Sequence, residues 1–329
     1  MRITSAHGGG GRLMNDLIHA VFQKHLSNPM LDRMEDAALL PSMDDRIAFT
    51  TDTFVVAPLF FPGGDIGRLA VCGTVNDLSM RGATPRYLSA GFVLEEGLEI
   101  ETLERAVVSM KRAADEAGVE VVAGDTKVIE GRGGMFINTS GIGVLDTLVD
   151  ISAHNAADGD AVLISGLLGD HHACILSCRM GIENNIRSDC APLTEMVRAL
   201  IRSGLHVHAL RDITRGGLAS VLHEIAACSQ VEIELFPSIA LASAQVQGFC
   251  DILGLDPLYM GNEGKLALIL PQAEAEQALH ILRGCRYGGY AQIIGAVRAA
   301  KSPAILQRTR AGSTRLIEPL LGEGLQRIC

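Results

Sequence analysis

The sequence predicts an α+β protein with two domains and a short C-terminal tail. With 329 residues, the chain exceeds the usual size of a single hydrophobic core, so two domains are expected. Helical and strand patterns alternate without the regular strand–helix–strand rhythm of a doubly wound parallel sheet. A polar stretch at residues 151–160 is typical of a domain boundary. The predicted units are therefore residues 1–150, residues 151–320 and a tail of residues 321–329.

In the first half, the hydrophobic pattern predicts strands and two helices. Alternating or β-branched residues predict four strands: 46–56, 87–94, 119–123 and 135–145. One helix, residues 66–80, follows a turn of proline and glycine. A second begins near Ile100, where apolar residues recur every three or four positions, and Gly118 is a common helix-ending residue.

The second half is predicted to hold a further mixture of strands and helices. The strands are expected at 161–165, 231–236, 265–270 and 290–297. The helices are expected at 171–180, 192–203 and 216–228. No short repeat and no low-complexity segment interrupts this order.

Composition and charge exclude several classes of protein. A hydrophobic content of 48% and a charged content of 20% are those of a soluble globular protein. The net charge of -10 argues against a nucleic-acid surface, because binding phosphates through a bulk field needs a basic excess. The N-terminus lacks a signal pattern, and no apolar run of about 18 residues could span a bilayer. We therefore expect a cytoplasmic protein with reduced thiols and no membrane partner.

The cysteines are scattered, and none forms a Cys-x-x-Cys pair, so neither a zinc site nor a thioredoxin-type motif is indicated. The last of them, Cys329, is the final residue and follows a segment loosened by Gly322 and Gly324. The thiolate is the nucleophilic form; the adjacent α-carboxylate disfavours it, whereas Arg327 favours it. An incidental terminal residue is the simpler interpretation of the tail alone, and the rest of the chain reverses that preference.

The phosphate-binding signals are unusual. Neither a P-loop nor a Gly-x-Gly-x-x-Gly after a strand occurs. Two other glycine clusters precede helical patterns, one at residues 7–11 and one at residues 63–67. Backbone N–H groups at a helix N-terminus attract anions, so both clusters could contact phosphate. Flexible turns are the alternative interpretation.

Acidic residues recur at predicted strand ends and helix starts. They include Asp36, Asp52, Asp77 and Asp125. Magnesium prefers oxygen ligands and commonly bridges carboxylates to nucleotide phosphates, although helix caps and turns would have a similar pattern. Two further polar clusters stand at residues 211–217, before a helix, and at residues 262–265, before an apolar strand.

These motifs resemble the HypE family of hydrogenase maturation proteins, within the ATP-binding superfamily of aminoimidazole ribonucleotide synthetase. The resemblance runs from His7 to Cys329, and the terminal Arg-Ile-Cys is its most specific part. Three positions depart from the family pattern: Gln326, Glu35 and His172. The motifs that carry the resemblance are Thr50-Thr51-Asp52, Phe61 to Gly67, Gly73 to Asp77, Gly124 to Lys127, Phe136 to Thr139, Ser188-Asp189-Cys190, Arg211 to Gly217 and Asn262 to Lys265.

The resemblance implies an ATP-dependent carbamoyl dehydratase that needs Mg²⁺. Such an enzyme would convert a carbamoyl group on its own terminal cysteine into a thiocyanate, which supplies cyanide ligands for the iron of nickel–iron hydrogenase. Dehydrating an amide in water requires activation of the leaving oxygen, and ATP provides it. A cysteine is suited to the carrier role because its sulfur holds the carbon covalently through both steps.

The resemblance also assigns roles to individual positions. Cys329 would be the acceptor thiol, Lys127 would stabilise charge, and Glu263 would be the base. The metal ligands would be Asp52, Asp77 and Asp125. The nucleotide would be bound by His7, Gly8, Gly9, Gly10, Gly11, Asp36, Gly63, Gly64, Asp65, Asn76, Asp125, Thr126, Arg211 and Arg215.

The family further implies a homodimer, in which the N-terminal sheet pairs with its copy into a barrel above a C-terminal α/β domain. The expected partners are a HypF-like carbamoyltransferase donor and an iron-carrying acceptor complex similar to HypC–HypD. Two alternatives stay open at this point. One is another ATP-dependent enzyme of the superfamily, such as a small-molecule kinase or synthetase; the other is a non-catalytic scaffold that carries a thiol-bound group.

Overall fold

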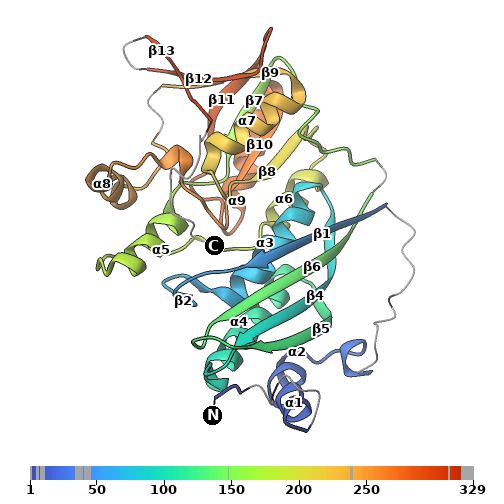
Figure 1. Cartoon of the computed structure of the whole chain (residues 1–329). Helices are drawn as coiled ribbons and strands as arrows, with labels where there is room; N and C mark the ends of the chain where they lie inside the picture. Colours follow the sequence, from blue (N-terminus) through green and yellow to red (C-terminus); the bar gives the residue numbers. More distant parts are fainter. Residues whose placement is uncertain are drawn as a thin grey trace.

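A computed structural model describes residues 2–4, 7, 12–33, 40, 46–146, 148–237, 240–309 and 312–319. It contains two large sheets, one in each half of the chain and each packed against helices, and a small two-stranded ribbon (Figure 1). The α+β class and the two-domain architecture predicted from the sequence are confirmed. Among the described residues, no helix is both long and apolar enough to cross a membrane.

The N-terminal sheet has four strands in the order β1-β6-β4-β5. Their bounds are β1 Arg46–Phe54, β4 Thr84–Glu95, β5 Glu120–Ile129 and β6 Met135–Leu145. Strands β4 and β5 are parallel, whereas β6 is antiparallel to both of its neighbours. Helices α3 (Ile66–Met80) and α4 (Ile100–Ala117) cover one face of the sheet (Figure 1).

The other face of this sheet carries exposed side chains. Along β1, residues 48, 50 and 52 are half-buried towards α3 and Phe54 is buried, whereas the odd-numbered residues are exposed, as expected from the two-residue period of a strand. Ile47 and Phe49 are apolar, yet they are 59% and 66% exposed. We call this the open face of the N-terminal sheet. The period-two pattern therefore sends Asp52 to the helix-covered face and its neighbour Thr53 to the open face.

The C-terminal sheet has seven strands in the order β13-β12-β9-β11-β7-β10-β8. Residues 266–270 of β10 and residues 161–164 of β7 are apolar and buried, because helices cover both faces of the sheet there. Helix α7 (Gly217–Ser229) packs on one face, and α6 (Thr194–Arg202) and α9 (Ala275–Gly284) pack on the other. The strands are β7 Asp160–Ile164, β8 Ala209–Asp212, β9 Val231–Leu235, β10 Leu266–Pro271, β11 Gln292–Ala299, β12 Ala304–Arg308 and β13 Thr314–Leu316.

Shorter elements surround these two layers. Helices α5 (Asp170–Met180) and α8 (Ala244–Leu253) lie beside each other at one side of the C-terminal domain (Figure 1). The small ribbon of β2 (Phe60–Phe61) and β3 (Gly64–Asp65) precedes α3. Near the N-terminus the chain forms α1 Arg12–Leu17, the π-helix Ile18–Gln23, α2 Lys24–Leu26 and the 3-10 turn Leu31–Arg33; two further 3-10 turns are Pro257–Tyr259 and Gln272–Glu274.

Candidate functional site between the two domains

The predicted acidic residues and the predicted basic cluster meet where the domains meet. Asp52 lies on β1 and Asp77 on α3 of the N-terminal domain, and strand β8 of the C-terminal domain packs beside α3. A cavity of about 300 Å³ opens at this boundary, and its lining includes Thr50, Asp77, Arg211 and Asp212. Side chains that are far apart in the sequence therefore share one polar cleft.

The carboxyl groups of Asp52 and Asp77 lie close enough for each to affect the ionisation of the other. Thr74 donates to Asp52 Oδ2 at 3.3 Å, and Thr50 donates to Asp77 Oδ2 at 2.9 Å. Burial, and secondly the charge of Asp77, raises the pKa of Asp52 to about 6, and burial also raises the pKa of Asp77. Two carboxyl groups this close disfavour double ionisation, so in the absence of a cation the pair takes up a proton as the pH falls towards 6.

Asp212 joins this pair, although the sequence analysis named only its neighbours as site residues. It is the last residue of β8 and lines the same cavity. Burial first, then the charges of Asp77 and Asp52, raise the pKa of Asp212 to about 7. The sequence does contain a signal for Asp212: it is an acidic residue at a strand end next to Arg211, and the predicted metal ligands Asp52 and Asp125 also lie in strands.

This arrangement suits a magnesium ion bridging to phosphate. A divalent cation would replace the proton that Asp52 and Asp77 take up and would relieve their repulsion. Among the described residues, no three or more His, Cys, Asp or Glu side chains converge as a ready-made metal cage. Magnesium commonly binds through one or two carboxylates and completes its shell with water and substrate phosphate. The donor set of the cleft therefore matches magnesium in its nucleotide-bridging role.

Positive charge faces the acidic pair from the C-terminal domain. Arg215 lowers the pKa of Asp52 through its charge, and Arg211 does the same to Asp77. Arg211 also pairs with Glu224 at 3.4 Å, and Arg215 is exposed. Both guanidinium groups are thus near enough to interact with an anion that enters beside the carboxylates.

Asp125 does not join Asp52 and Asp77 within one chain. It pairs in register with Gly91, which pairs with Asn138, which pairs with Thr53, so this row of residues points to the open face. There Asp125 forms an ion pair with Lys127 at 3.0 Å, and both side chains are about two-thirds exposed, at 64% and 66%. The expected three-aspartate ligand set is therefore divided between the two faces of the sheet.

Thr126, between these two residues, points the other way and is buried. Asn76 is also buried, and its side chain spans the two domains. It donates to the carbonyl of Ala191 at 3.1 Å and accepts from the backbone N–H of Leu193 at 2.8 Å. The structure thus shows an interdomain contact for Asn76, and its predicted role in nucleotide binding stays a prediction.

The glycines before α3 have packing roles. A Cβ on Gly63, whose φ is +94°, would lie 2.4 Å from the carbonyl oxygen of Ser188, and one on Gly64 would lie 2.8 Å from the Phe61 ring. Asp65 is the N-cap of α3, and its carboxylate accepts from the N–H groups of Gly67 at 2.9 Å and Arg68 at 3.0 Å. The helix N-terminus expected to bind phosphate is therefore already occupied by Asp65.

The remaining predicted nucleotide residues lie near the N-terminus, and the predicted acceptor thiol is in the tail. His7 is buried, and its Nδ1 accepts from the backbone N–H of Thr4 at 3.1 Å. Gly8 to Gly11, Glu35, Asp36, Gln326 and Cys329 lie outside the described residues. Their predicted roles stay predictions.

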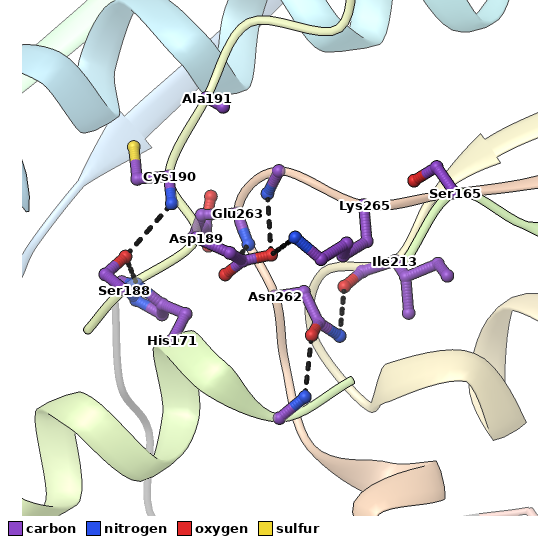
Figure 2. A network of polar contacts seen from close by, with 12 residues as sticks. Ser165, His171, Ser188, Asp189, Cys190, Ala191, Ile213, Asn262, Glu263 and Lys265 are labelled. Carbon is purple, nitrogen blue, oxygen red and sulfur yellow. Dashed lines mark hydrogen bonds and ion pairs between the residues drawn. The ribbon is translucent and has the colours of Figure 1, made fainter. Parts of the chain in front are cut away.

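Glu263 lies in a separate polar network of the C-terminal domain (Figure 2). It is 6% exposed and follows Asn262, whose side chain accepts from Gly169 N at 2.8 Å and donates to the carbonyl of Ile213 at 3.1 Å. The pKa of Cys190 is raised well above its usual value by a hydrogen bond with Cys72, by burial, and also by the charge of Glu263. The Glu263 carboxylate therefore faces Cys190, whereas Lys127 stands on the open face of the other domain.

Two buried histidines flank this network. His171 and His172 begin α5, and burial lowers the pKa of each to about 4, so both rings are neutral at pH 7. His171 Nδ1 hydrogen-bonds to Ser188 Oγ at 2.8 Å. His172, which departs from the family pattern, accepts from Gly261 N at 3.4 Å. Within the described part of the chain, the Nε2 atoms of both rings have no hydrogen-bond partner.

Comparison with known proteins agrees with this architecture. Residues 34–145 match the family model of the N-terminal domain of AIR synthase related proteins, and residues 157–306 match that of its C-terminal domain. The chain is 45% identical to the carbamoyl dehydratase HypE of Rhodobacter capsulatus over 336 residues, covering 100% of this chain and 98% of that protein.

Solved structures extend the likeness to three dimensions. A crystal structure of hydrogenase maturation protein HypE in complex with ATP has a TM-score of 0.94 and 47% identity, covering 99% of each chain. A crystal structure of a HypE–HypF complex contains a chain with a TM-score of 0.81 and 44% identity, covering 94% of this chain and 100% of that one. The chain therefore belongs to the HypE family of AIR synthase related proteins.

Proposed function

We propose that this protein is an ATP-dependent carbamoyl dehydratase that converts a carbamoyl group on Cys329 into a thiocyanate during hydrogenase maturation. The observation that carries the proposal is the cleft at the domain boundary, which Asp77 and Arg211 line and beside which the charge of Arg215 acts on Asp52. The names of full-length relatives at about 45% identity favour this activity over a small-molecule kinase or a thiol carrier without catalysis.

The proposed reaction balances without a redox partner. The S-carbamoyl group and ATP yield the thiocyanate, ADP, inorganic phosphate and one proton. The carbonyl oxygen of the carbamoyl group leaves as part of the phosphate, and both N–H protons are lost as the C≡N bond forms. Bound Mg²⁺ would neutralise phosphate charge. The protein contributes mainly position and electrostatic stabilisation, as in other phosphoryl transfers.

Each side chain of the cleft has a role in this proposal. Asp52 and Asp77 hold the magnesium ion, and Asp212 is a third carboxylate beside them. Arg211 and Arg215 contact the phosphates. An ion held by Asp52 of β1 and Asp77 of α3 would lie at the domain boundary, because α3 packs beside β8 of the other domain.

Glu263 is proposed as the base that removes the N–H protons. It is 6% exposed and stands just before the apolar strand β10, so water has little access to its side chain. Lys127 and Asp125 are on the open face, so we propose that they act in the dimer, where a second copy covers that face. Lys127 would stabilise charge on the departing phosphate.

The proposed assembly is a homodimer formed through the open face of the N-terminal sheet. Ile47 and Phe49 are exposed apolar side chains on its edge strand, and an exposed strand edge or apolar face is usually covered. A HypF-like carbamoyltransferase is the proposed donor, in keeping with the HypE–HypF complex of a relative. A complex similar to HypC–HypD is the proposed acceptor.

The test is mass spectrometry of the C-terminal peptide after incubation with a carbamoyl donor system and Mg-ATP. We expect a carbamoyl increment on Cys329, followed by loss of one water mass. Cys329→Ala should keep its fold and its ATP affinity but show neither increment. Cys285→Ala, at a half-buried thiol of the C-terminal domain outside the cleft, is the matched control and should behave like the wild type. An adduct on Cys72 or Cys190 in the wild type would overturn the assignment.

A further inference from the structure

The motif Ser188-Asp189-Cys190 has no role in the proposed chemistry, yet the structure places it between the two domains. We call residues 188–191 the bridging segment. On one side it is attached to the turn before α3 and to α3 itself. Three hydrogen bonds make this attachment: Ser188 N to Pro62 O at 2.8 Å, Arg68 Nε to Cys190 O at 2.8 Å, and Asn76 Nδ2 to Ala191 O at 3.1 Å.

On its other side, the bridging segment holds the backbone of Glu263. The Asp189 carboxylate accepts from Glu263 N and from Gly264 N, each at 3.2 Å (Figure 2). Ala191 N donates in return to the carbonyl of Glu263 at 3.2 Å. The contact is so close that a Cβ on Gly264 would lie 2.0 Å from the carbonyl oxygen of Asp189. Glu263 is thus fixed by hydrogen bonds to both its N–H and its C=O.

The Asp189 carboxylate is also a buried charge with a buried counterion. Its side chain is 3% exposed, and Lys265 Nζ, at 12% exposure for that side chain, lies 3.3 Å from Asp189 Oδ2. Placing an ion pair out of water costs several kcal/mol per ion unless it is well compensated. Two backbone N–H groups and one ammonium provide that compensation. Burying a neutral side chain would have a smaller desolvation penalty, so a gain in stability does not explain why this position is a carboxylate.

From this geometry we propose that Asp189 is a positioning residue for the dehydration step: it fixes the Glu263 backbone and, through the bridging segment, sets Glu263 relative to α3, the helix that carries Asp77. The inference rests on the proposed role of Glu263 as the base. Asp189 touches neither the carbamoyl group nor ATP in this proposal. Its effect is to keep the base within hydrogen-bond reach of a substrate whose nucleotide is held by the other domain.

The experiment compares Asp189→Asn, Glu263→Gln and the double variant D189N/E263Q in the full-length dimer. Single-turnover mass spectrometry measures conversion of Cys329-carbamoyl to the cyano form, with ATP affinity measured separately. D189N should slow conversion about 10- to 100-fold, a typical cost of displacing a catalytic group, with ATP affinity unchanged. In the E263Q background, adding D189N should lower the conversion rate by less than roughly threefold, because both changes disable the same function. Asp251→Asn, on exposed α8, is the control.

A second readout does not depend on activity. Hydrogen exchange of the peptide that spans residues 261–266 should be about tenfold faster in D189N, because the Glu263 and Gly264 amides lose a charged acceptor. If D189N fails to fold, D189N/K265M removes the whole ion pair and leaves no lone buried charge. It should fold, convert carbamoyl slowly and exchange quickly at the same peptide.

The outcomes separate the two proposals. If the losses of D189N and E263Q multiply, or if D189N converts at the wild-type rate, Asp189 does not act through Glu263 and the inference is wrong, while the dehydratase activity stands. If E263Q itself converts normally, the base assignment and this inference both fail. If the wild type never forms a cyano adduct on Cys329, the proposed function fails, which is a distinct result.

Discussion

At the scale of single residues, Asp52 and Asp77 are the clearest indication of chemistry. Their burial and mutual repulsion make ionisation of both carboxyl groups unfavourable, and a bound cation would remove that penalty. Both carboxyls are partly buried beside each other, and the pKa of Asp52 is raised to about 6. Magnesium requires the ionised form. Binding must therefore displace the proton that the pair takes up, which makes affinity dependent on pH.

We expect Mg-ATP affinity to fall as pH decreases below 6, approaching tenfold per pH unit, because each bound magnesium then displaces one proton from Asp52. Asp77→Asn should weaken Mg-dependent ATP binding by about tenfold or more at pH 7.5 and flatten this pH dependence. Titration calorimetry between pH 5 and 8 measures both effects. Asp115→Asn, at an exposed aspartate of α4, is the control; an unchanged affinity in D77N would mean that Asp77 holds no metal.

A second residue-scale prediction concerns Asp212. Its pKa is raised from 3.8 to about 7, so its favourable contribution to stability is complete below about pH 4 and is lost as pH rises through 7. Asp212→Asn should therefore stabilise the protein without metal at pH 8, by about 1 kcal/mol or roughly 2 °C in Tm, and have little effect at pH 4.5. Thermal unfolding at the two pH values tests this. A loss of stability at pH 8 would contradict it.

At the scale of elements, the packing of α3 on α4 positions the helix that carries Asp77. The helices touch closely at Gly67, where a Cβ would lie 1.9 Å from the carbonyl oxygen of Ala106. The backbone of Ala106 could make room for a Cβ only if the two helices moved apart. Both helices form the inner layer between the N-terminal sheet and the rest of that domain's core. The cleft therefore depends on an interface that tolerates only glycine at this point.

Gly67→Ala should lower the free energy of unfolding by about 2–4 kcal/mol, the usual range for overpacking and its backbone shifts. Gly248→Ala is the matched control, because Gly248 also lies in a helix, α8, and its Cβ would meet nothing within 4 Å. That change should be neutral or stabilising by up to about 1 kcal/mol through helix propensity. Urea unfolding of both variants makes the comparison, and equal stabilities would contradict the steric argument.

At the scale of the whole molecule, the open face of the N-terminal sheet is the feature that one chain leaves incomplete. It carries Ile47 and Phe49 and also Asp125 and Lys127. A homodimer through this face would bury the apolar pair and would bring the charged pair into the interior of the assembly. A second copy of the chain would thus explain why some predicted site residues lie on the open face and others on the helix-covered face.

We expect light scattering to give twice the 34.9 kDa mass of one chain at micromolar concentration. Ile47→Asp should shift the protein towards the monomer by at least about tenfold in dissociation constant, because it places a charge in the apolar interface. Ile252→Asp, on α8, changes an isoleucine that is even more exposed, 84% against 59% for Ile47, and lies away from the sheet; it should keep the dimer. A wild-type monomer at that concentration would refute the proposed assembly.

The sequence predicts local structure well wherever one face of an element is buried. The predicted strand at 135–145 coincides with β6, whose burial alternates from end to end. The predicted helix at 66–80 coincides with α3, although nearly all of its residues are buried. Strand β8, which supplies Asp212, was not predicted: it has four residues, too few to show a period. Helices α8 and α9 and strands β12 and β13 were likewise not assigned.

By itself, the sequence determined the fold class, the family and the identity of the residues from which the cleft is built, since periodicity and motif spacing are properties of the chain order. Only the tertiary structure decided which of those residues meet. Asp52 and Asp125 occupy similar positions in two strands, yet strand register turns them to opposite faces of one sheet. Asp189 and Glu263 are 74 residues apart, and only packing of the bridging segment against the Glu263 turn brings them into contact. Side-chain direction and long-range contact follow from the register and packing of the whole chain, which no local pattern encodes.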